Sequence, residues 1–180
     1  MTTFLLVRHG ETDWNFERRV QGQADRPLND TGRAQASALA DELESEPIDV
    51  VYSSDLVRAH ETARTVAERK GLPVIALPEL REKHFGSWEG LTEEDVLARF
   101  PEARRGHWGD AETNEEVTSR VLAALQRIAE THPHGRVLVV SHGGPLRALL
   151  RHCGADGTGP IGNCHVARIE SLEGNLRAVD

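Results

Sequence analysis

Residues 4–10 read FLLVRHG, so that a run of four apolar side chains leads directly into Arg8 and His9. A short, uninterrupted apolar run is typical of a strand that is buried on both faces of a parallel sheet. The pattern returns in RVLVVSHG, residues 136–143, where the apolar run ends in Ser141 and His142. Ligands of open parallel sheets bind beyond the carboxyl ends of the strands. The two runs therefore predict that His9 and His142 meet at one site.

The rest of the chain alternates between helix and strand patterns. Predicted helices cover residues 31–43, 56–69, 92–101, 113–131 and 145–153, and further predicted strands cover residues 49–52, 74–77, 164–170 and 176–179. The first helix is expected to begin after a capping Asn29 or Asp30, and the second to end at Gly71 in a left-handed conformation. This order predicts an α/β fold, a three-layer α/β/α sandwich whose central sheet is mostly parallel with an antiparallel edge strand.

Composition limits the kind of protein that the chain can be. It has 180 residues, of which 38% are hydrophobic, and this suits one domain over residues 1–180 with a sizeable core. The net charge of -8 argues against a nucleic acid partner, because the summed field repels polyanions. No apolar run is long enough for a signal peptide or a membrane span, so a cytoplasmic location without membrane contact is expected. We interpret Cys153 and Cys164 as reduced thiols.

Histidine and arginine in this arrangement indicate phosphoryl chemistry. A neutral imidazole is a good nucleophile near neutral pH and can carry a phosphoryl group as a covalent intermediate. The planar fork of arginine matches the spacing of phosphate oxygens, so Arg8 and a second arginine would form a clamp. The candidate is Arg58, just inside the helix that follows the second strand, in YSSDLVRAHETA, residues 52–63. Either histidine alone would more often be structural, but the pair beside Arg8 favours a functional site.

Four segments of the chain together resemble the blocks of the histidine phosphatase superfamily. They are RHGETDWN (residues 8–15), YSSDLVRAHETA (52–63), LREKHFGSWEG (80–90) and SHGGPLRALL (141–150). The resemblance covers nearly the whole chain, and the similar branch contains the cofactor-dependent phosphoglycerate mutases and their phosphatase relatives. It implies a metal-independent phosphomonoesterase without a cofactor, which hydrolyses small phosphorylated metabolites through a phosphohistidine.

The resemblance also implies a role for each central residue. His9 would be phosphorylated, and Glu82 would be the proton donor. Three side chains would bind the transferring group and stabilise its charge: Arg8, Arg58 and His142. Further phosphate contacts are implied for Asn15, Gln21, Gly22 and the backbone of Gly143. Only the resemblance selects Glu82 among the nearby carboxylates Glu79, Glu89, Glu93 and Glu94.

Several other residues of these segments have less direct roles. Loop bracing is expected for Glu11, Thr12, Trp14 and Trp88. Phe85 would either line a leaving-group pocket or simply pack. A surface or interface position is expected for His107, His132, His134, His152 and His165.

A metal-site interpretation is rejected, although histidine and carboxylate side chains are the ligands that zinc or manganese prefers. Its candidate ligands would be His9, Glu11, His84 and His142. A metal ion would be redundant beside two arginines, and the resembled family works without one. The glycine-rich segment at residues 154–162 lacks the pattern of a nucleotide-binding loop and is interpreted as a connection.

Three alternatives to a small-molecule phosphatase stay open: a mutase, a regulatory phosphoprotein phosphatase and a non-catalytic binding module. The mutases carry a longer, basic insertion after the third block and usually have asparagine where this chain has Gly144. Here the segment after Phe100 is short, which favours a phosphatase, but its Arg104 and Arg105 keep a second anionic group on the substrate open. The identity of the phosphomonoester and the oligomeric state, a homodimer included, are not determined by the sequence.

Overall fold

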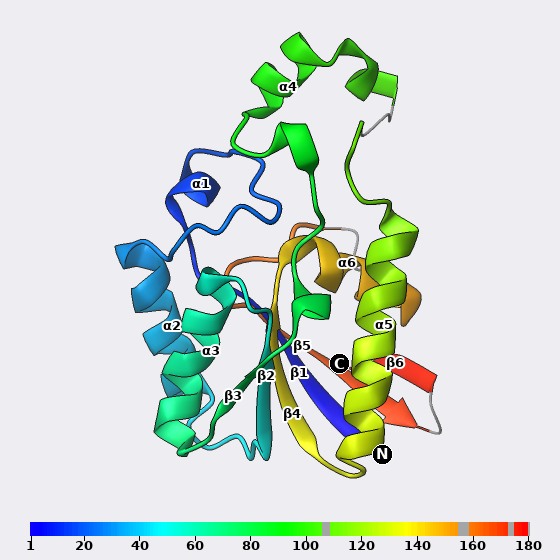
Figure 1. Cartoon of the computed structure of the whole chain (residues 1–180). Coiled ribbons are helices and arrows are strands. Elements are labelled where there is room, and N and C mark those ends of the chain that lie inside the picture. The colour runs from blue at the N-terminus through cyan, green and yellow to red at the C-terminus, as the bar shows by residue number, and fades with distance from the viewer. Residues whose placement is uncertain (106–108, 155–158, 173–174, 180) are drawn as a thin grey trace.

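A six-stranded mixed sheet forms the centre of the computed structural model, which describes residues 1–105, 109–154, 159–172 and 175–179 (Figure 1). The strands are β1 (Thr2–Arg8), β2 (Val50–Ser53), β3 (Val74–Ala76), β4 (Arg136–Ser141), β5 (Val166–Leu172) and β6 (Asn175–Val179). Their order is β3-β2-β4-β1-β5-β6, and the first four strands in this order run parallel. β5 pairs antiparallel with β1, and β6 pairs antiparallel with β5. The mostly parallel sheet with an antiparallel edge is therefore confirmed.

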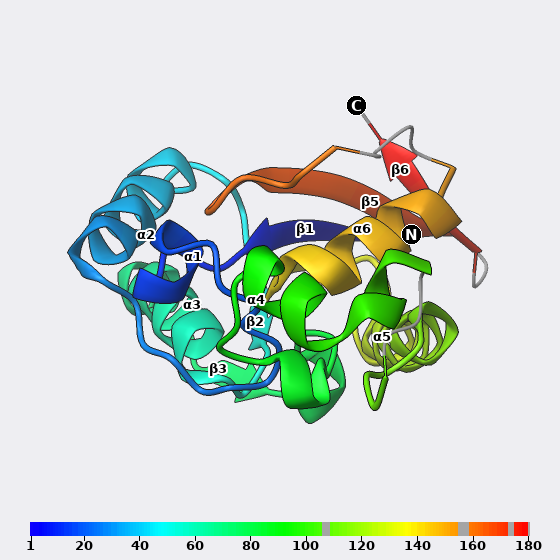
Figure 2. The same cartoon turned by 90° about the horizontal axis from the view of Figure 1, so that it is seen from above.

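Helices cover both faces of the sheet, as Figures 1 and 2 show. Helices α2 (Asp30–Glu42) and α3 (Val57–Lys70) pack on one face, and α5 (Asn114–Thr131) and α6 (Gly143–His152) pack on the other. Successive strand residues point to opposite faces, so Leu5 and Val7 join the cluster under α2 and α3, whereas Phe4 and Leu6 join the cluster under α5. The predicted three-layer sandwich is confirmed. Within the described residues, no helix is long and apolar enough to cross a membrane.

Local sequence signals place most element ends correctly. The side chain of Asn29 caps α2 by accepting a hydrogen bond from the Gly32 amide. Gly71 ends α3 in the left-handed conformation, with a φ of 65°. The helix predicted from residue 145 begins earlier, at Gly143, because the two glycines form its first turn. The strand predicted at residues 164–170 lies two residues later, since Cys164 has a positive φ that ends extended pairing there.

Short helices that the sequence pattern did not predict gather beyond the carboxyl ends of the parallel strands. They are α1 (Asp13–Phe16) and the 3-10 turns η1 (Pro78–Leu80), η2 (Gly86–Trp88) and η3 (Pro101–Arg105); the shortest predicted helix, α4 (Glu93–Arg99), lies with them. Figure 1 shows α1 and α4 above the end of the sheet where β1 and β4 finish. These turns are too short to show helical periodicity.

Candidate active site

His9 lies immediately after β1 and is 2% exposed. Its amide donates a hydrogen bond to the Ser141 carbonyl over 3.0 Å, and its carbonyl accepts one from the Asn163 side chain over 2.8 Å. On the ring, Nδ1 lies 2.6 Å from the Gly10 carbonyl oxygen. A carbonyl can only accept, so Nδ1 carries the proton and Nε2 keeps its lone pair. The backbone thus holds His9 in the tautomer that presents a nucleophilic nitrogen.

Arg58 lies beside that nitrogen, on the first turn of α3, and is completely buried. Its Nε donates to His9 Nε2 over 3.3 Å, while its Nη1 and Nη2 donate to the carbonyls of Ala24 and Gly22 over 2.9 and 2.7 Å. Burial lowers the pKa of Arg58 to about 10. The guanidinium therefore stays charged at neutral pH.

His142 also lies next to His9, with 5.1 Å between the two ring centroids. It is the residue immediately before α6 and is fully buried. Neither of its ring nitrogens has a hydrogen-bond partner among the described residues. The Nε of Arg8 is buried and unpartnered in the same way, although Arg8 Nη1 donates to the Ile161 carbonyl over 2.6 Å. Leaving a buried polar group unsatisfied costs about 1–3 kcal/mol. Such atoms gathered around His9 are suited to binding an anion with several oxygens.

Burial and the arginines control the charge of both histidines. The pKa of His9 lies well below its usual value, first because of burial and then because of the positive charges of Arg58 and Arg8. The pKa of His142 is lowered well below the usual value too, by burial and then by Arg58. Both imidazoles are therefore neutral at neutral pH, which is the form that can act as a nucleophile or accept a hydrogen bond.

Glu82 reaches the same centre from the loop after η1. One carboxylate oxygen, Oε1, accepts a hydrogen bond from the Lys83 amide over 2.8 Å, and Oε2 accepts one from the Gly144 amide over 3.2 Å, in the first turn of α6. A Cβ atom at Gly144 would overlap the Glu82 carboxylate. The glycine at this position thus lets a carboxyl group approach the amino end of α6.

The other carboxylates near Glu82 in the sequence have different surroundings. Glu89 braces the loops by accepting from the amides of Gln23 and Phe85, and Glu79 pairs with Arg127 on the surface. Glu93 and Glu94 are exposed in the first turn of α4. Glu82 is thus the carboxylate of this group that contacts α6 beside His142.

The loop that carries Glu82 is held by Arg120 of α5, which the sequence analysis missed. The guanidinium of Arg120 donates to the carbonyls of Glu79, Arg81 and Glu82 over 2.8, 2.7 and 3.1 Å. It also forms a bidentate ion pair with Glu112, with N–O distances of 2.6 and 2.9 Å. No sequence pattern signals this arginine, because the carbonyls that it binds lie about 40 residues away in the chain.

The secondary site residues take part in the loops around this centre. The carbonyl of Gly22 binds Arg58, and a Cβ atom at Gly143 would lie 3.6 Å from Arg8 Nε. The side-chain oxygens of Asn15 and Gln21 both accept from the Thr12 hydroxyl, over 3.2 and 2.9 Å. The structure therefore places Gly22 and Gly143 against the central arginines, and ties Asn15 and Gln21 to the loop after β1.

Two of the side chains that were expected to brace the loops make such contacts. Glu11 accepts a hydrogen bond from the Asn29 side chain, and Trp14 stacks under Arg26.

Among the described residues, no three histidine, cysteine, aspartate or glutamate side chains gather as a metal site. His132 is half-buried and lies 3.0 Å from the Tyr52 hydroxyl. The side chains of Arg104 and Arg105, and His107, lie outside the described part of the chain.

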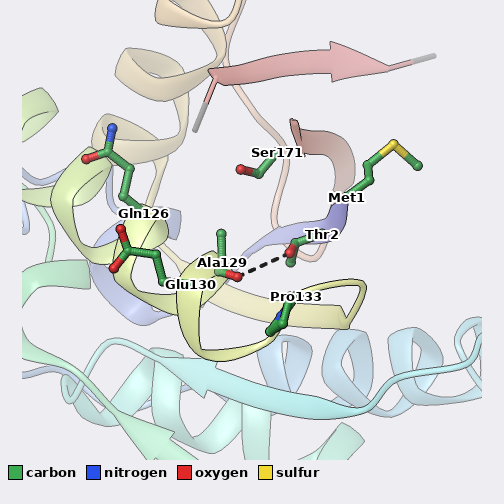
Figure 3. Close-up of a pocket in the computed structure, with 7 residues that line it drawn as sticks. All are labelled: Met1, Thr2, Gln126, Ala129, Glu130, Pro133 and Ser171. Carbon is green, nitrogen blue, oxygen red and sulfur yellow. Dashed lines mark hydrogen bonds between the residues drawn. The ribbon is translucent and has the colours of Figure 1, made fainter. Parts of the chain in front are cut away.

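Of two hollows in the protein surface, one adjoins this centre and the other lies away from it. A cleft of about 740 Å³ adjoins it and includes Phe85 and Gly144 in its lining. Another hollow, drawn in Figure 3, lies at the opposite end of β1, where the Thr2 hydroxyl donates to the Ala129 carbonyl. Its described lining contains Glu130 and no arginine, lysine or histidine side chain. Of these two hollows, the first is therefore the one available to a molecule bound at His9.

The chain is similar to several known proteins. The family model for the histidine phosphatase superfamily (branch 1) matches residues 4–179. A metal-independent phosphoserine phosphatase of Arabidopsis thaliana is 41% identical over 179 residues, which cover 92% of this chain and 75% of that protein. A probable phosphoglycerate mutase of Photorhabdus laumondii is 34% identical, over 94% and 85%. The structure of mycobacterial glucosyl-3-phosphoglycerate phosphatase in complex with VO3 superposes with a TM-score of 0.87 at 31% identity, over 97% and 95%.

Proposed function

The chain belongs to the histidine phosphatase superfamily, and we propose that it hydrolyses small phosphorylated metabolites in two steps, without a metal ion, through a phosphohistidine on His9. It is a phosphatase, since the family and the named phosphatases among its relatives and structural neighbours agree. A net charge of -8 supports a small substrate rather than a nucleic acid. What is proposed beyond this is the mechanism and the role of each residue.

The first step transfers the phosphoryl group to His9. The lone pair of Nε2 forms a bond to phosphorus as the bond from phosphorus to the leaving oxygen breaks. Glu82 gives its proton to that oxygen, so that an alcohol leaves instead of an alkoxide. Arg8 and Arg58 balance the charge that spreads over the equatorial phosphoryl oxygens. The neutral ring of His142 can donate one hydrogen bond to them.

The second step returns the enzyme to its starting state. Glu82, now a carboxylate, takes a proton from water while the water oxygen bonds to phosphorus. The bond between phosphorus and Nε2 breaks, and its electron pair returns to His9. Inorganic phosphate, a neutral His9 and a protonated Glu82 result, so each step is balanced.

One observation carries the proposal: the hydrogen bond from His9 Nδ1 to the Gly10 carbonyl, which leaves Nε2 as the nucleophile next to Arg58 Nε. A purely structural histidine in this position would need no buried arginine against its second nitrogen. The unpartnered nitrogens of Arg8 and His142 on the same side support the same assignment.

A mutase would share this centre, and one relative is named a probable phosphoglycerate mutase. A mutase must retain its bisphosphorylated intermediate, whereas a phosphatase must admit water. We favour hydrolysis because the segment after Phe100 is short. Release of inorganic phosphate, as opposed to isomerised ester, separates the two activities.

The test is phosphate release from a panel of phosphomonoesters, in the presence of chelator, by the wild type, His9→Ala and His165→Ala. We expect release by the wild type and by His165→Ala, because His165 is exposed, and none by His9→Ala. An acid-labile phosphoryl label should appear on the wild type and on His165→Ala, and not on His9→Ala. Substantial release by a folded His9→Ala variant would overturn the phosphohistidine mechanism.

A further inference from the structure

The cleft beside Glu82 has a strongly one-sided charge. It is lined by Lys83, Phe85, Asn114, Thr118, Gly144, Arg147, Ala148, Arg151, His152 and Pro160. Three of these side chains are cationic and one is a histidine, while no aspartate or glutamate is among the described residues of the lining. The chain as a whole carries 29 acidic against 21 basic side chains. A wall of one sign in such a chain attracts anions locally.

The cleft continues directly from the reaction centre. Gly144 lines the cleft, and its amide donates to Glu82 Oε2. A Cβ atom at the neighbouring Gly143 would lie 3.6 Å from Arg8 Nε and 3.8 Å from Arg147 Nη1. The charge of Arg147 also contributes to lowering the pKa of Arg8. A group that leaves from phosphorus on the Glu82 side would therefore enter this cleft.

Arg147 and Arg151 are four residues apart on α6, so they present their guanidinium groups on one helix face. Arg147 is half-buried and Arg151 is exposed. Within the described residues neither guanidinium group forms a hydrogen bond or ion pair, whereas those of Arg81, Arg120 and Arg127 are all paired with carboxylates. Two neighbouring cations without a carboxylate repel each other unless an anion binds between them.

The other walls suit an organic molecule. Phe85, Ala148 and Pro160 are apolar, and Asn114 and Thr118 can form neutral hydrogen bonds. The volume of about 740 Å³ lies in the range of pockets for small metabolites, roughly 300–1,000 Å³.

We propose that this cleft is a second anion subsite, in which Arg147 and Arg151 bind an anionic group on the leaving group of the phosphomonoester. The inference rests on the proposed phosphatase function and names its substrate class: phosphomonoesters that carry a further carboxylate or phosphate. Arg147 and Arg151 are specificity residues here, and Phe85 lines the organic part of the leaving group.

The test compares kcat/KM for esters that differ in their second anion. For a carboxylate, 3-phosphoglycerate is compared with glycerol 3-phosphate; for a phosphate, fructose 1,6-bisphosphate is compared with fructose 6-phosphate; and p-nitrophenyl phosphate carries neither. The variants are Arg147→Gln, Arg151→Gln and their double variant. Arg64→Gln is the matched control, because Arg64 loses the same charge on an exposed part of α3.

We expect the wild type and Arg64→Gln to prefer, in at least one pair, the member that carries the second anionic group. The double variant should lose about 10- to 100-fold in kcat/KM for that member, the effect of a charged hydrogen bond, and keep its activity on p-nitrophenyl phosphate within about threefold. The pair that shows the preference identifies carboxylate or phosphate as the second anion.

Two results would overturn the subsite, and they are distinguishable. In the first, p-nitrophenyl phosphate is hydrolysed in a His9-dependent way, but the wild type shows no preference in either pair, or the double variant loses activity equally on all esters. This result removes the subsite alone. No His9-dependent release from any ester removes the phosphatase function and the subsite with it.

Discussion

At the scale of single residues, the proposed chemistry depends on how His9 is held. The Gly10 carbonyl sets its tautomer, and burial together with Arg58 and Arg8 lowers its pKa, so the imidazole stays neutral at neutral pH, as the proposed nucleophile must be. Arg58 is held by two backbone carbonyls, which orient its fork before any ligand binds. Such preorganisation reduces the reorganisation needed during the reaction.

The lowered pKa values of His9 and His142 predict a stability that falls in mild acid. Below the ordinary value of 6.5 the unfolded chain binds protons on these residues that the folded chain does not. The free energy of unfolding should then decrease by up to about 1.4 kcal/mol per pH unit for each histidine. Carboxylates with lowered pKa values, such as Asp55 and Glu112, act at lower pH, since their ordinary values are 3.8 and 4.5.

Urea unfolding between about pH 7 and pH 5 measures this slope. His9→Gln should reduce it by up to about 1.4 kcal/mol per pH unit, whereas His165→Gln, at an exposed position, should leave it unchanged. An equal slope in wild type and His9→Gln would contradict the prediction.

At the scale of elements, the site depends on a loop that is fixed by a distant helix. Arg120 of α5 donates to three backbone carbonyls, one in η1 and two in the loop that carries Glu82, and Glu112 holds the guanidinium in place. Ser141, at the end of β4, adds a hydrogen bond to the Leu80 carbonyl over 2.7 Å. Helix, strand and loop are thereby joined behind the carboxyl group.

We expect Arg120→Ala to lower kcat for alkyl phosphates by roughly 10- to 100-fold, within the contribution of a general acid. KM should change little, since Arg120 lies behind the loop. p-Nitrophenyl phosphate has a good leaving group and needs less protonation, so its kcat should fall much less. A purely structural role would lower both activities equally.

Arg120→Lys should restore part of the lost kcat, because an ammonium group can still bind one or two of the carbonyls. Arg127→Ala is the control, since Arg127 lies on the same helix and pairs with Glu79 at the surface. Steady-state kinetics on both ester types measure the difference.

At the scale of the whole molecule, sheet order brings the site together. β4 lies between β1 and β2, and Arg8 pairs in register with Ser141, so the residues that follow these strands are neighbours. β2 leads into α3, whose first turn carries Arg58. The short helices beyond the sheet then cover this end, as Figure 2 shows from above.

Because the site is assembled by folding, an anion bound there should stabilise the whole domain. Inorganic phosphate with chelator should raise the free energy of unfolding by about 2.7 kcal/mol at 100 times its Kd, which corresponds to a rise in Tm of roughly 5–10 °C. Arg58→Gln should abolish the rise, whereas Arg64→Gln, on the same helix, should preserve it. A similar rise in Arg58→Gln would place the phosphate elsewhere.

Local features of the sequence determined much of this protein. The apolar runs before His9 and His142 predict adjacent buried strands, Asn29 and Gly71 mark helix ends, and the alternation of elements predicts the sandwich. These features are readable because capping, strand burial and helix periodicity depend on residues close together in the chain. The choice of Glu82 among its neighbours came from family resemblance instead.

Tertiary structure alone decided the tautomer of His9, the brace formed by Arg120, and the joining of Lys83 with Arg147 and Arg151 around one cleft. Each depends on distances between groups that lie tens of residues apart or on the exact path of the backbone. A sequence pattern records which side chains exist and which face of an element they occupy. It does not record which loop packs against that face, because this follows from the packing of the complete core.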